Sequence, residues 1–495
     1  MKAKNYHMMS GYQKVIYHLS LFFKNLPHNL KKFFKILGKA IACFFIRIVE
    51  GFANFGRTFS EGNKFTKLSF LIMGLSCLIY GPFWMGLSFF LIEILFILFI
   101  KEFAILYLVD LTTLGTQAEV ETFNEAKGIM EYITADNSML ILLYSVLSLV
   151  VICIFIIAYI QSTKECLNAQ HRHEREEQAQ SFKMMLRSLK DENYHITLLS
   201  IPTLLLICFT VIPLIFMILL AFTNYDANHQ PPGNLFTWVG FGNFKDIFGK
   251  NAIKSYTFLY LLQWDLIWSF FATFLNYILG MILAMMINKK GIRGKKIWRT
   301  IFVITIAVPQ FVTLLLMSKI LGDNGTVNLI LERFGLQTIP FLTDGHTARI
   351  VIIIVNLWVG IPYTMLITSG ILMNIPSELY ESAKIDGANA AVSFFKITLP
   401  YVLFVTTPYL ITQFVGNFNN FNVIYLLTGG GPQSTVLYQA GETDLLVTWL
   451  YKLTINYQDY NLASVIGILV FVVSASLSLI VFNMSSSVKN EEQFQ

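Results

Sequence analysis

Uncharged amides interleaved with aromatic rings form two clusters inside apolar stretches of the sequence. The first cluster runs from Asn356 to Tyr363, and the second runs from Gln413 to Asn422. Amides exchange hydrogen bonds with hydroxyl groups, and aromatic rings pack against the apolar face of a pyranose. Neither cluster carries a fixed charge, which favours a neutral sugar over an ion or an amino acid. The alternative for any single asparagine is a hydrogen bond that only joins two helices.

A polar stretch, residues 376–400, lies between two apolar segments. Pro376 prevents a helix from continuing and Ser377 is a favourable N-cap, so the sequence predicts that a helix begins there. Gly387 is suited to the left-handed conformation that ends a helix. Nine residues separate this glycine from the tetrad that ends the stretch: Ile397, Thr398, Leu399 and Pro400.

The composition indicates an integral membrane protein. Of its 495 residues, 55% are hydrophobic and only 13% are charged, whereas soluble domains carry about 25% charged residues. The five cysteines form no C-x-x-C pair, so the sequence predicts neither a disulfide framework nor a metal site. The basic N-terminal region is too long for a cleavable signal peptide, and the first membrane helix is expected to be an uncleaved anchor.

The elements that must position these residues are membrane helices. A span across about 30 Å of hydrocarbon needs about 20 residues. Eight stretches meet this length, near 84–108, 138–160, 196–223, 258–288, 298–321, 346–372, 402–426 and 462–484. A shorter run, 68–80, is either re-entrant or a ninth span. The predicted fold class is an all-α polytopic membrane protein with about eight transmembrane helices.

The placement of Lys and Arg predicts the orientation, because loops rich in these residues stay in the cytoplasm. Residues 1–67 carry twelve of them against two acids, 161–195 carry six, and 289–299 carry six. The loop 109–137 carries one, together with six acids. Both termini and residues 376–400 are therefore expected on the cytoplasmic face of the plasma membrane. Asp265 is expected near the outer end of its span and in contact with water.

The polar stretch resembles the coupling motif of ABC importer permeases, E-A-A-x-x-x-G-x9-I-x-L-P, with a serine in place of the first alanine. This resemblance implies a short helix, a glycine turn and a second helix, which dock into a cleft on an ATPase subunit. The coupling residues that it implies are Glu381, Ser382, Ala383, Gly387, Ile397, Leu399 and Pro400.

Over residues 196–485 the chain is similar to permease subunits of the MalF type, which belong to maltose/maltodextrin importers. The similarity rests on Asn417-Phe-Asn-Asn-Phe421, on Ile424-Tyr-Leu-Leu-Thr-Gly-Gly-Gly-Pro432 and on Gly441-Glu-Thr-Asp-Leu-Leu446. It implies a six-helix core of the type I importer fold. The sugar-contacting positions that it implies are Asn356, Gly360, Tyr363, Gln413, Gly416, Asn417 and Asn420.

Two features depart from that family pattern. Gly416 stands where some relatives have a bulky aromatic residue, which leaves stacking at this position and the preferred oligosaccharide length open. The outer loop 224–257 is short, whereas enterobacterial relatives carry a large folded domain there. A binding protein is therefore expected to dock on a smaller surface.

The expected domain organisation follows from these patterns. Its parts are a basic amphipathic cytoplasmic segment 1–67, accessory membrane helices 68–160 with the outer loop 109–137, a cytoplasmic linker 161–195, the permease core 196–485 with the coupling loop 376–400, and a cytoplasmic tail 486–495. The first segment mixes Lys with Phe at helical spacing, which indicates binding to anionic membrane lipid. Nucleic acid is not an expected partner.

The chain is not expected to be an enzyme or to bind a cofactor. It has no phosphate-binding G-x-x-x-x-G-K-[ST] loop, since the run Gly429-Gly-Gly-Pro432 lacks the lysine and is predicted to be a helix-ending turn. The resemblance implies that ATP is bound by partners. The implied assembly has a second homologous permease subunit of the MalG type, two ABC ATPase subunits and an extracellular lipid-anchored sugar-binding protein.

The predicted function is therefore one half of the translocation pore of an ATP-driven importer for maltodextrin-like oligosaccharides. One alternative is an ABC permease for another oligosaccharide, of the raffinose or galacto-oligosaccharide type. An ion-coupled secondary sugar transporter is a second alternative, but it would need paired intramembrane acids, which are scarce here. A membrane enzyme such as a glycosyltransferase would need a carboxylate cluster at a membrane face.

Overall fold

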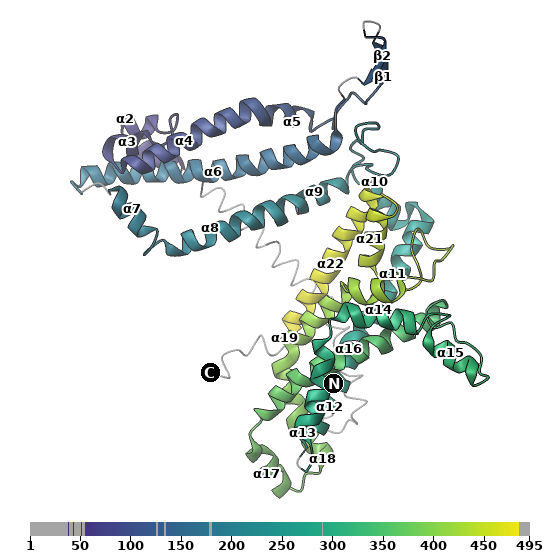
Figure 1. Cartoon of the computed structure of the whole chain (residues 1–495). Helices are drawn as coiled ribbons and strands as arrows, with labels where there is room; N and C mark the ends of the chain where they lie inside the picture. Colours follow the sequence, from purple (N-terminus) through teal and green to yellow (C-terminus); the bar gives the residue numbers. More distant parts are fainter. Residues whose placement is uncertain are drawn as a thin grey trace, which may run out of the picture. The chain divides into compact units, whose positions relative to one another are not determined.

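The computed structural model describes residues 55–124, 127–132, 135–177, 181–289 and 291–484, together with Gly38, Cys43 and Gly51. Most of the basic segment 1–67 and all of the tail 486–495 lie outside the described residues. The chain forms two compact units, one of Met1–Met217 with Pro231–Thr237 and one of Ile218–Gln230 with Trp238–Gln495. These are called the first and second units below, and Figure 1 shows their elements.

The first unit consists of helices and one β-hairpin, after a helical stretch at 55–61. Its elements are α2 (Lys64–Leu68), α3 (Leu75–Tyr80), α4 (Phe83–Phe99), a π-helical turn (Ile100–Ala104), α5 (Ile105–Asp110), β1 (Glu121–Asn124), β2 (Ile129–Tyr132), α6 (Ser138–Glu174), α7 (Phe182–Ser188), α8 (Tyr194–Leu206), a second π-helical turn (Ile207–Val211) and most of α9 (Ile212–Leu220). The hairpin is antiparallel, with Glu121 opposite Tyr132 and Phe123 opposite Met130.

The run 68–80 does not form a ninth span. It contains the end of α2, a turn and the six-residue helix α3, and neither helix approaches the length that crosses a bilayer. Gly74 makes the turn with a φ of 78°. A Cβ on Gly74 would lie 2.5 Å from the carbonyl oxygen of Gly86, so the two glycines allow the turn to pack directly on α4.

Glu93 in α4 stabilises this turn. Its carboxylate accepts a hydrogen bond of 2.8 Å from the backbone N–H of Met73, which is fully buried. Tyr159 of α6 similarly donates to the carbonyl oxygen of Phe70 at 2.6 Å. Both bonds satisfy backbone groups that the turn leaves without a helical partner. The intramembrane acid therefore has a structural partner within the first unit.

Helix α6 extends into residues 161–195, which the sequence analysis assigned to a linker. Helix α6 continues as one helix of 37 residues to Glu174, so residues 161–174 extend a membrane helix and only the remainder up to Asn193 connects it to α8. Asn137 starts α6 by accepting hydrogen bonds from the N–H groups of Met139 and Leu140.

The second unit is entirely helical in its regular structure over the residues described. Its elements are α10 (Gly242–Lys245), a π-helical turn (Asp246–Lys250), α11 (Ala252–Phe270), a π-helical turn (Phe271–Leu275), α12 (Asn276–Asn288), α13 (Lys295–Ala307), α14 (Gln310–Ile320), α15 (Thr326–Arg333), α16 (Gly345–Met373), α17 (Ser377–Ile385), α18 (Ala390–Ser393), a π-helical turn (Phe394–Thr398), α19 (Leu399–Phe418), α20 (Phe421–Thr428), α21 (Leu446–Ile455) and α22 (Tyr460–Met484).

Seven helices in the described residues are long and apolar enough to cross a membrane, and a bent pair makes up to eight. They confirm an all-α polytopic membrane fold. The bent pair is α13 and α14, which meet at 87° within the span predicted at 298–321. Pro309 causes the break, because it cannot supply the N–H that would continue α13. The span predicted at 402–426 instead covers Ala390–Phe418, since the chain breaks at Asn419 and Asn420.

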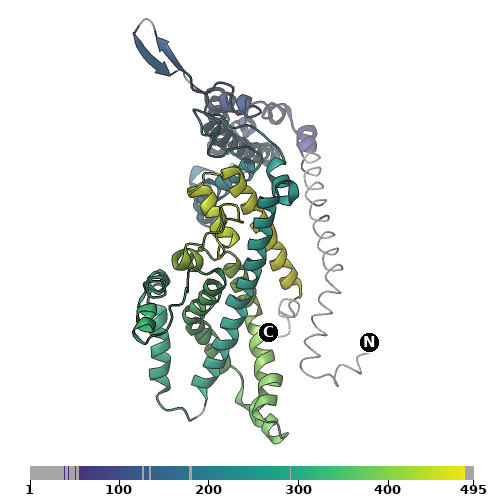
Figure 2. The same cartoon turned by 90° about the vertical axis from the view of Figure 1, so that its right-hand side faces the viewer.

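Apolar clusters lie along α11 and α12 in the second unit. One is built around the fully buried Trp268 and Leu314, and another around Tyr277 and Val402. Figures 1 and 2 show the α17–α18 segment at one end of this unit and α10 and α21 toward the other. The middle of α16 therefore lies between the α17–α18 segment at one end of the unit and α10 and α21 toward the other end.

Asp265 is buried, not wet. Its side chain has 0% exposure, and its Oδ2 accepts a 3.3 Å hydrogen bond from the N–H of Leu446 at the start of α21. Its Oδ1 has no partner among the described residues. The expectation of a solvated carboxylate was wrong, because α21 folds over this part of α11 and excludes water from it.

Candidate functional site

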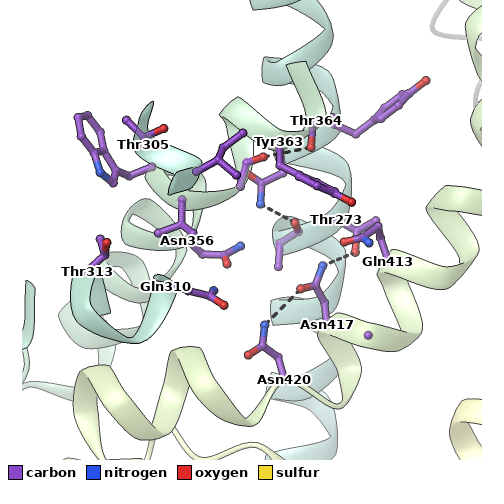
Figure 3. Close-up of a pocket in the computed structure, with 18 of the residues that line it drawn as sticks. Thr273, Thr305, Gln310, Thr313, Asn356, Tyr363, Thr364, Gln413, Asn417 and Asn420 are labelled. Atoms are coloured by element: carbon purple, nitrogen blue, oxygen red, sulfur yellow. Dashed lines mark hydrogen bonds between the residues drawn. The ribbon is translucent and has the colours of Figure 1, made fainter. Parts of the chain in front are cut away.

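A cavity of ≈ 480 Å³ lies in the second unit among the central parts of its membrane helices (Figure 3). It is lined by the joint between α11 and α12, the bend between α13 and α14, and the facing sides of α16 and α19. Its 22 lining residues include no Asp, Glu, Lys, Arg or His. The polar members of the lining are Thr273, Asn276, Tyr277, Thr305, Gln310, Thr313, Asn356, Tyr363, Thr364, Tyr409, Gln413, Asn417 and Asn420.

All the sugar-contacting positions implied by the sequence border this one cavity: Asn356, Gly360, Tyr363, Gln413, Gly416, Asn417 and Asn420. Two amides among them are held by the protein. Asn417 donates from Nδ2 to Thr273 Oγ1 at 2.9 Å. Asn420 is the N-cap of α20, and its Oδ1 accepts from the N–H of Val423 at 3.1 Å. These two side chains therefore brace the helices as well as line the cavity.

The other two amides, Asn356 and Gln413, make no hydrogen bond to the residues that the structure describes, and the same is true of Gln310. Figure 3 shows Asn356, Gln310 and Asn420 around a common space. Amides that the protein leaves free can exchange hydrogen bonds with a molecule in the cavity.

The two glycines of the set differ in their surroundings. A Cβ on Gly416 would have nothing within 4 Å, so this position faces open space. A Cβ on Gly360 would lie 2.6 Å from Nδ2 of Asn276. Gly360 is thus needed for close packing of an asparagine of α12 against α16. Helix α16 runs without a break through Pro362.

The sequence reasoning missed the contributions of α12, α13 and α14. Thr273 and Asn276 come from the end of α11 and the start of α12, where a π-helical turn (Phe271–Leu275) interrupts the α-helix. Such turns are frequent at functional sites. Gln310 follows the Pro309 break and begins α14. For Asn276 and Gln310 the available signal was a lone amide within an apolar stretch.

Residues 376–400, which the sequence predicts to be a coupling segment, contain the predicted glycine turn. Gly387 has a φ of 78°, the left-handed region that favours glycine. The N–H of Ala388 bonds to the carbonyl of Ala383 at 2.8 Å, and the N–H of Gly387 bonds to that of Lys384 at 3.0 Å. This pair of bonds is the Schellman motif. Ser377 is not the N-cap, because Pro376 occupies that position and Ser377 is the first helical residue.

Many side chains of residues 376–400 are exposed. Glu381, Ser382 and Gly387 are exposed, and the side chain of Ile385 is 88% exposed. Tyr380 of α17 forms a 2.8 Å hydrogen bond with Thr398, at the end of the π-helical turn before α19. Among the residues at the start of α19, Ile397 and Leu399 are half-buried and Pro400 is exposed. Ala383 is half-buried.

The comparisons with known proteins agree with this architecture. The family of binding-protein-dependent transport system inner membrane components matches residues 276–489. The galactooligosaccharide transport permease GanP of Bacillus subtilis is 39% identical over 359 residues, which are 72% of this chain and 85% of GanP. The maltodextrin transport permease MalC of Streptococcus pneumoniae is 34% identical over 414 residues, which are 80% of this chain and 90% of MalC. The chain belongs to this permease family.

A solved structure supports the fold of the permease. The match is a chain of a bacterial ABC transporter involved in the import of the acidic polysaccharide alginate. Its TM-score is 0.50 at 25% identity, covering 61% of this chain and 98% of that one. The permease is therefore a multi-pass membrane protein and a transport component.

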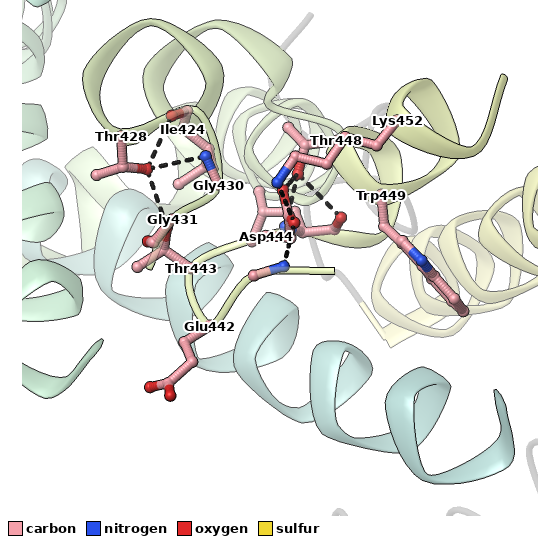
Figure 4. A network of polar contacts seen from close by, with 12 residues as sticks. Ile424, Thr428, Gly430, Gly431, Glu442, Thr443, Asp444, Thr448, Trp449 and Lys452 are labelled. Atoms are coloured by element: carbon pink, nitrogen blue, oxygen red, sulfur yellow. Dashed lines mark hydrogen bonds and ion pairs between the residues drawn. The ribbon is translucent and has the colours of Figure 1, made fainter. Parts of the chain in front are cut away.

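The motif Gly441–Leu446 of the permease does not line the cavity. Asp444 in this motif forms an ion pair of 2.6 Å with Lys452 of α21, and both side chains are buried (Figure 4). The same carboxylate accepts from Thr448 at 2.9 Å and from the N–H of Gly441 at 2.7 Å. Burial raises the pKa of the Asp444 carboxyl, and the ammonium group of Lys452 opposes that rise. This motif is the polar core of the segment that includes α20 and α21.

The glycine run ends α20 as predicted. Gly429 has a φ of 60° and its N–H bonds to the carbonyl of Tyr425 at 3.0 Å. Gly430 cannot carry a side chain, because a Cβ there would collide with Oδ1 of Asp444. The run is therefore a helix-ending turn that lets the chain pack over the buried ion pair.

Proposed function

We propose that this permease carries neutral oligosaccharides and that the cavity binds the sugar during transport. The observation that carries the proposal is the absence of charged and histidine side chains among the 22 residues of the lining. Amides, hydroxyls and aromatic rings offer a sugar both hydrogen-bond partners and apolar faces. An ion or an amino acid would call for a fixed countercharge in such a site.

Maltodextrin-like oligosaccharides are the first candidate substrate. The sequence motifs at Asn417–Phe421 and Gly441–Leu446 resemble those of MalF-type permeases, and the MalC relative is a maltodextrin permease. Galacto-oligosaccharides are the second candidate, because the GanP relative transports them and is 39% identical.

ATP bound by separate subunits is the proposed energy source. The sequence of the permease has no phosphate-binding loop, and its coupling segment offers an exposed turn with Ile385 outermost. An apolar side chain on a polar segment is well suited to insertion into a partner's cleft. The proposed assembly has a MalG-type second permease, two ATPases and an extracellular lipid-anchored binding protein. This permease itself is proposed to bind no cofactor.

The proposed topology has both termini and the coupling segment in the cytoplasm, as the Lys and Arg distribution predicts. Closure of the ATPase dimer would then move the coupling segments and switch the cavity from inward-facing to outward-facing access. Helix α19 begins at the coupling segment and ends at Asn417 and Phe418 beside the cavity, so it is a direct mechanical connection between the two.

The test is competitive uptake in a strain from which the permease gene has been deleted. Labelled maltotriose and labelled β-galactotriose are each supplied to cells carrying the deletion or the restored gene, with competition by maltose to maltoheptaose, raffinose and β-galactotriose. Uptake is expected only in cells that carry the permease gene. One class of neutral oligosaccharide is expected to compete with the labelled sugar. Failure of every neutral sugar, with transport of a charged solute, would refute the proposal.

An ion-coupled transporter predicts a different result in the same cells. Uptake by an ATP-driven importer should persist when a protonophore collapses the ion gradient and ATP is maintained. The permease should also copurify with an ATPase subunit. Loss of uptake with the gradient, and no copurifying ATPase, would favour the secondary transporter instead.

A further inference from the structure

Asn276 carries a buried oxygen atom with no partner. The residue begins α12 and lines the cavity with only 7% of its surface exposed. Its Nδ2 donates to the carbonyl oxygen of Ala272 at 2.8 Å, which fixes the orientation of the amide. Its Oδ1 accepts no hydrogen bond from the residues that the structure describes.

Such an oxygen is unusual, because most buried side-chain acceptors are hydrogen-bonded in folded proteins. Asparagine is also a costly choice in an apolar stretch unless its amide is used. Asn288, on the same helix, makes the contrast clear. Its Nδ2 donates to the carbonyl of Ala284 at 2.9 Å, and its Oδ1 accepts from Arg299 at 2.9 Å. The protein satisfies Asn288 and leaves Asn276 half satisfied.

The neighbouring helix is shaped to hold this amide. All three outer atoms of the Asn276 side chain lie within 2.8 Å of where a Cβ on Gly360 would be. Only glycine leaves this room on α16. The side chain of Asn276 therefore has little freedom to turn away from the position in which its Oδ1 is unpaired.

We propose that Oδ1 of Asn276 accepts a hydrogen bond from one hydroxyl group of the transported sugar, and that Gly360 positions the amide for it. This proposal rests on the proposed function. Because the acceptor has no other partner, the site selects for a free hydroxyl at one ring position. A sugar that is deoxygenated or O-methylated at that position should be transported poorly, since it cannot donate.

The experiment compares Asn276→Leu with the matched control Asn288→Leu in the complete importer, reconstituted in proteoliposomes with one and the same binding protein. The wild type is first tested with maltotriose and with β-galactotriose. The probes are then the trisaccharide that it transports and the monodeoxy derivatives of that sugar. Because the binding protein is constant, ratios between variants isolate the selectivity of the permease. Uptake is normalised to the amount of assembled complex.

Asn276→Leu is expected to raise the KM for the parent sugar roughly tenfold. For one monodeoxy derivative, wild type and Asn276→Leu should have the same KM, because the hydroxyl partner is already absent. Gly360→Ala should reproduce this pattern by displacing the amide. Asn288→Leu should lower the melting temperature of the complex without changing the ratio of parent to deoxy sugar.

Equal losses for the parent and every deoxy derivative would overturn the proposal and assign Asn276 to helix packing. An unchanged KM for the parent sugar would overturn it as well. Asn276→Ala replaces the leucine variant where assembly fails, since it removes the amide with less bulk. If the wild type transports neither probe, the neutral sugar that it does transport and the monodeoxy derivatives of that sugar replace them. The proposed function itself fails only if the wild type transports no neutral sugar, and that outcome is distinct from a failure of the Asn276 assignment.

Discussion

The amide side chains around the cavity differ in whether they already form hydrogen bonds within the protein. Asn417 and Asn420 are occupied in bonds to Thr273 and Val423, whereas Asn356 and Gln413 have no partner among the described residues. The same residue type in one sequence cluster thus has two roles. The free amides of Asn356 and Gln413 supply most of the hydrogen-bonding capacity for a sugar. The amides of Asn417 and Asn420 instead stabilise the helices that line the cavity.

Asn356→Leu and Gln413→Leu are therefore expected to impair uptake while leaving thermal stability unchanged. Each removes a hydrogen bond to a desolvated sugar hydroxyl, worth about 1–3 kcal/mol, or roughly tenfold in KM. Asn420→Leu should weaken uptake and also lower stability, because loss of an N-cap costs about 1 kcal/mol. Uptake per assembled complex and melting in detergent are measured in parallel. Equal destabilisation by all three changes would contradict this division.

Gly416 faces open space, and this predicts how a bulky residue there would act. Gly416→Phe should fit without collision, since nothing lies within 4 Å of the added Cβ, and it should occupy part of the ≈ 480 Å³ cavity. We expect uptake of longer oligosaccharides to fall several-fold relative to short ones. Competition with maltose to maltoheptaose measures this preference, and an unchanged length profile would place Gly416 outside the sugar path.

At the scale of elements, the coupling segment is a helix, a left-handed glycine and a second short helix that leads into α19. Gly387 ends α17 through the Schellman motif. Gly335 ends α15 in the same way, with a φ of 71° and bonds from its own N–H and that of Leu336. Two identical helix ends therefore exist in one chain, and only one belongs to the coupling segment.

Gly387→Pro is expected to abolish binding-protein-stimulated ATPase activity and uptake while the permease stays in the membrane. Proline fixes φ near −65° and removes the N–H that bonds to Lys384. Glu381→Lys, on the exposed face, should weaken coupling without disturbing the turn. Gly335→Pro is the matched control, because it breaks the same motif elsewhere. Normal stimulated ATPase activity in both coupling variants would remove the coupling role from this segment.

Local rules predicted these elements better than they predicted the site. The glycine turn at 387, the helix-ending run at 429–431 and most spans follow from backbone preferences of single residues and from hydrophobic length. The 87° bend at Pro309 and the burial of Asp265 depend on what packs against them. Thr273, Asn276 and Gln310 were missed because their place in the cavity is set by contacts between helices far apart in sequence.

At the scale of the whole molecule, α19 and α20 connect three places in the second unit. Helix α19 starts at the coupling segment and ends at the cavity, and α20 starts at the Asn420 cap and ends at Gly429 near the buried Asp444–Lys452 pair. We therefore expect that a change at either end is transmitted along these two helices. Such a connection requires that the segment with the ion pair be rigid.

Breaking that ion pair tests the requirement. Lys452→Met should destabilise the permease by roughly 3–5 kcal/mol, because it leaves the Asp444 carboxylate buried without its cation. The double variant Asp444→Asn with Lys452→Met should recover much of this loss, since an amide can still accept from the N–H of Gly441. Melting of the complex in detergent measures both. Uptake per folded complex should recover together with stability, because no atom of the pair lines the cavity. Recovered stability without recovered uptake would instead give the pair a direct part in transport.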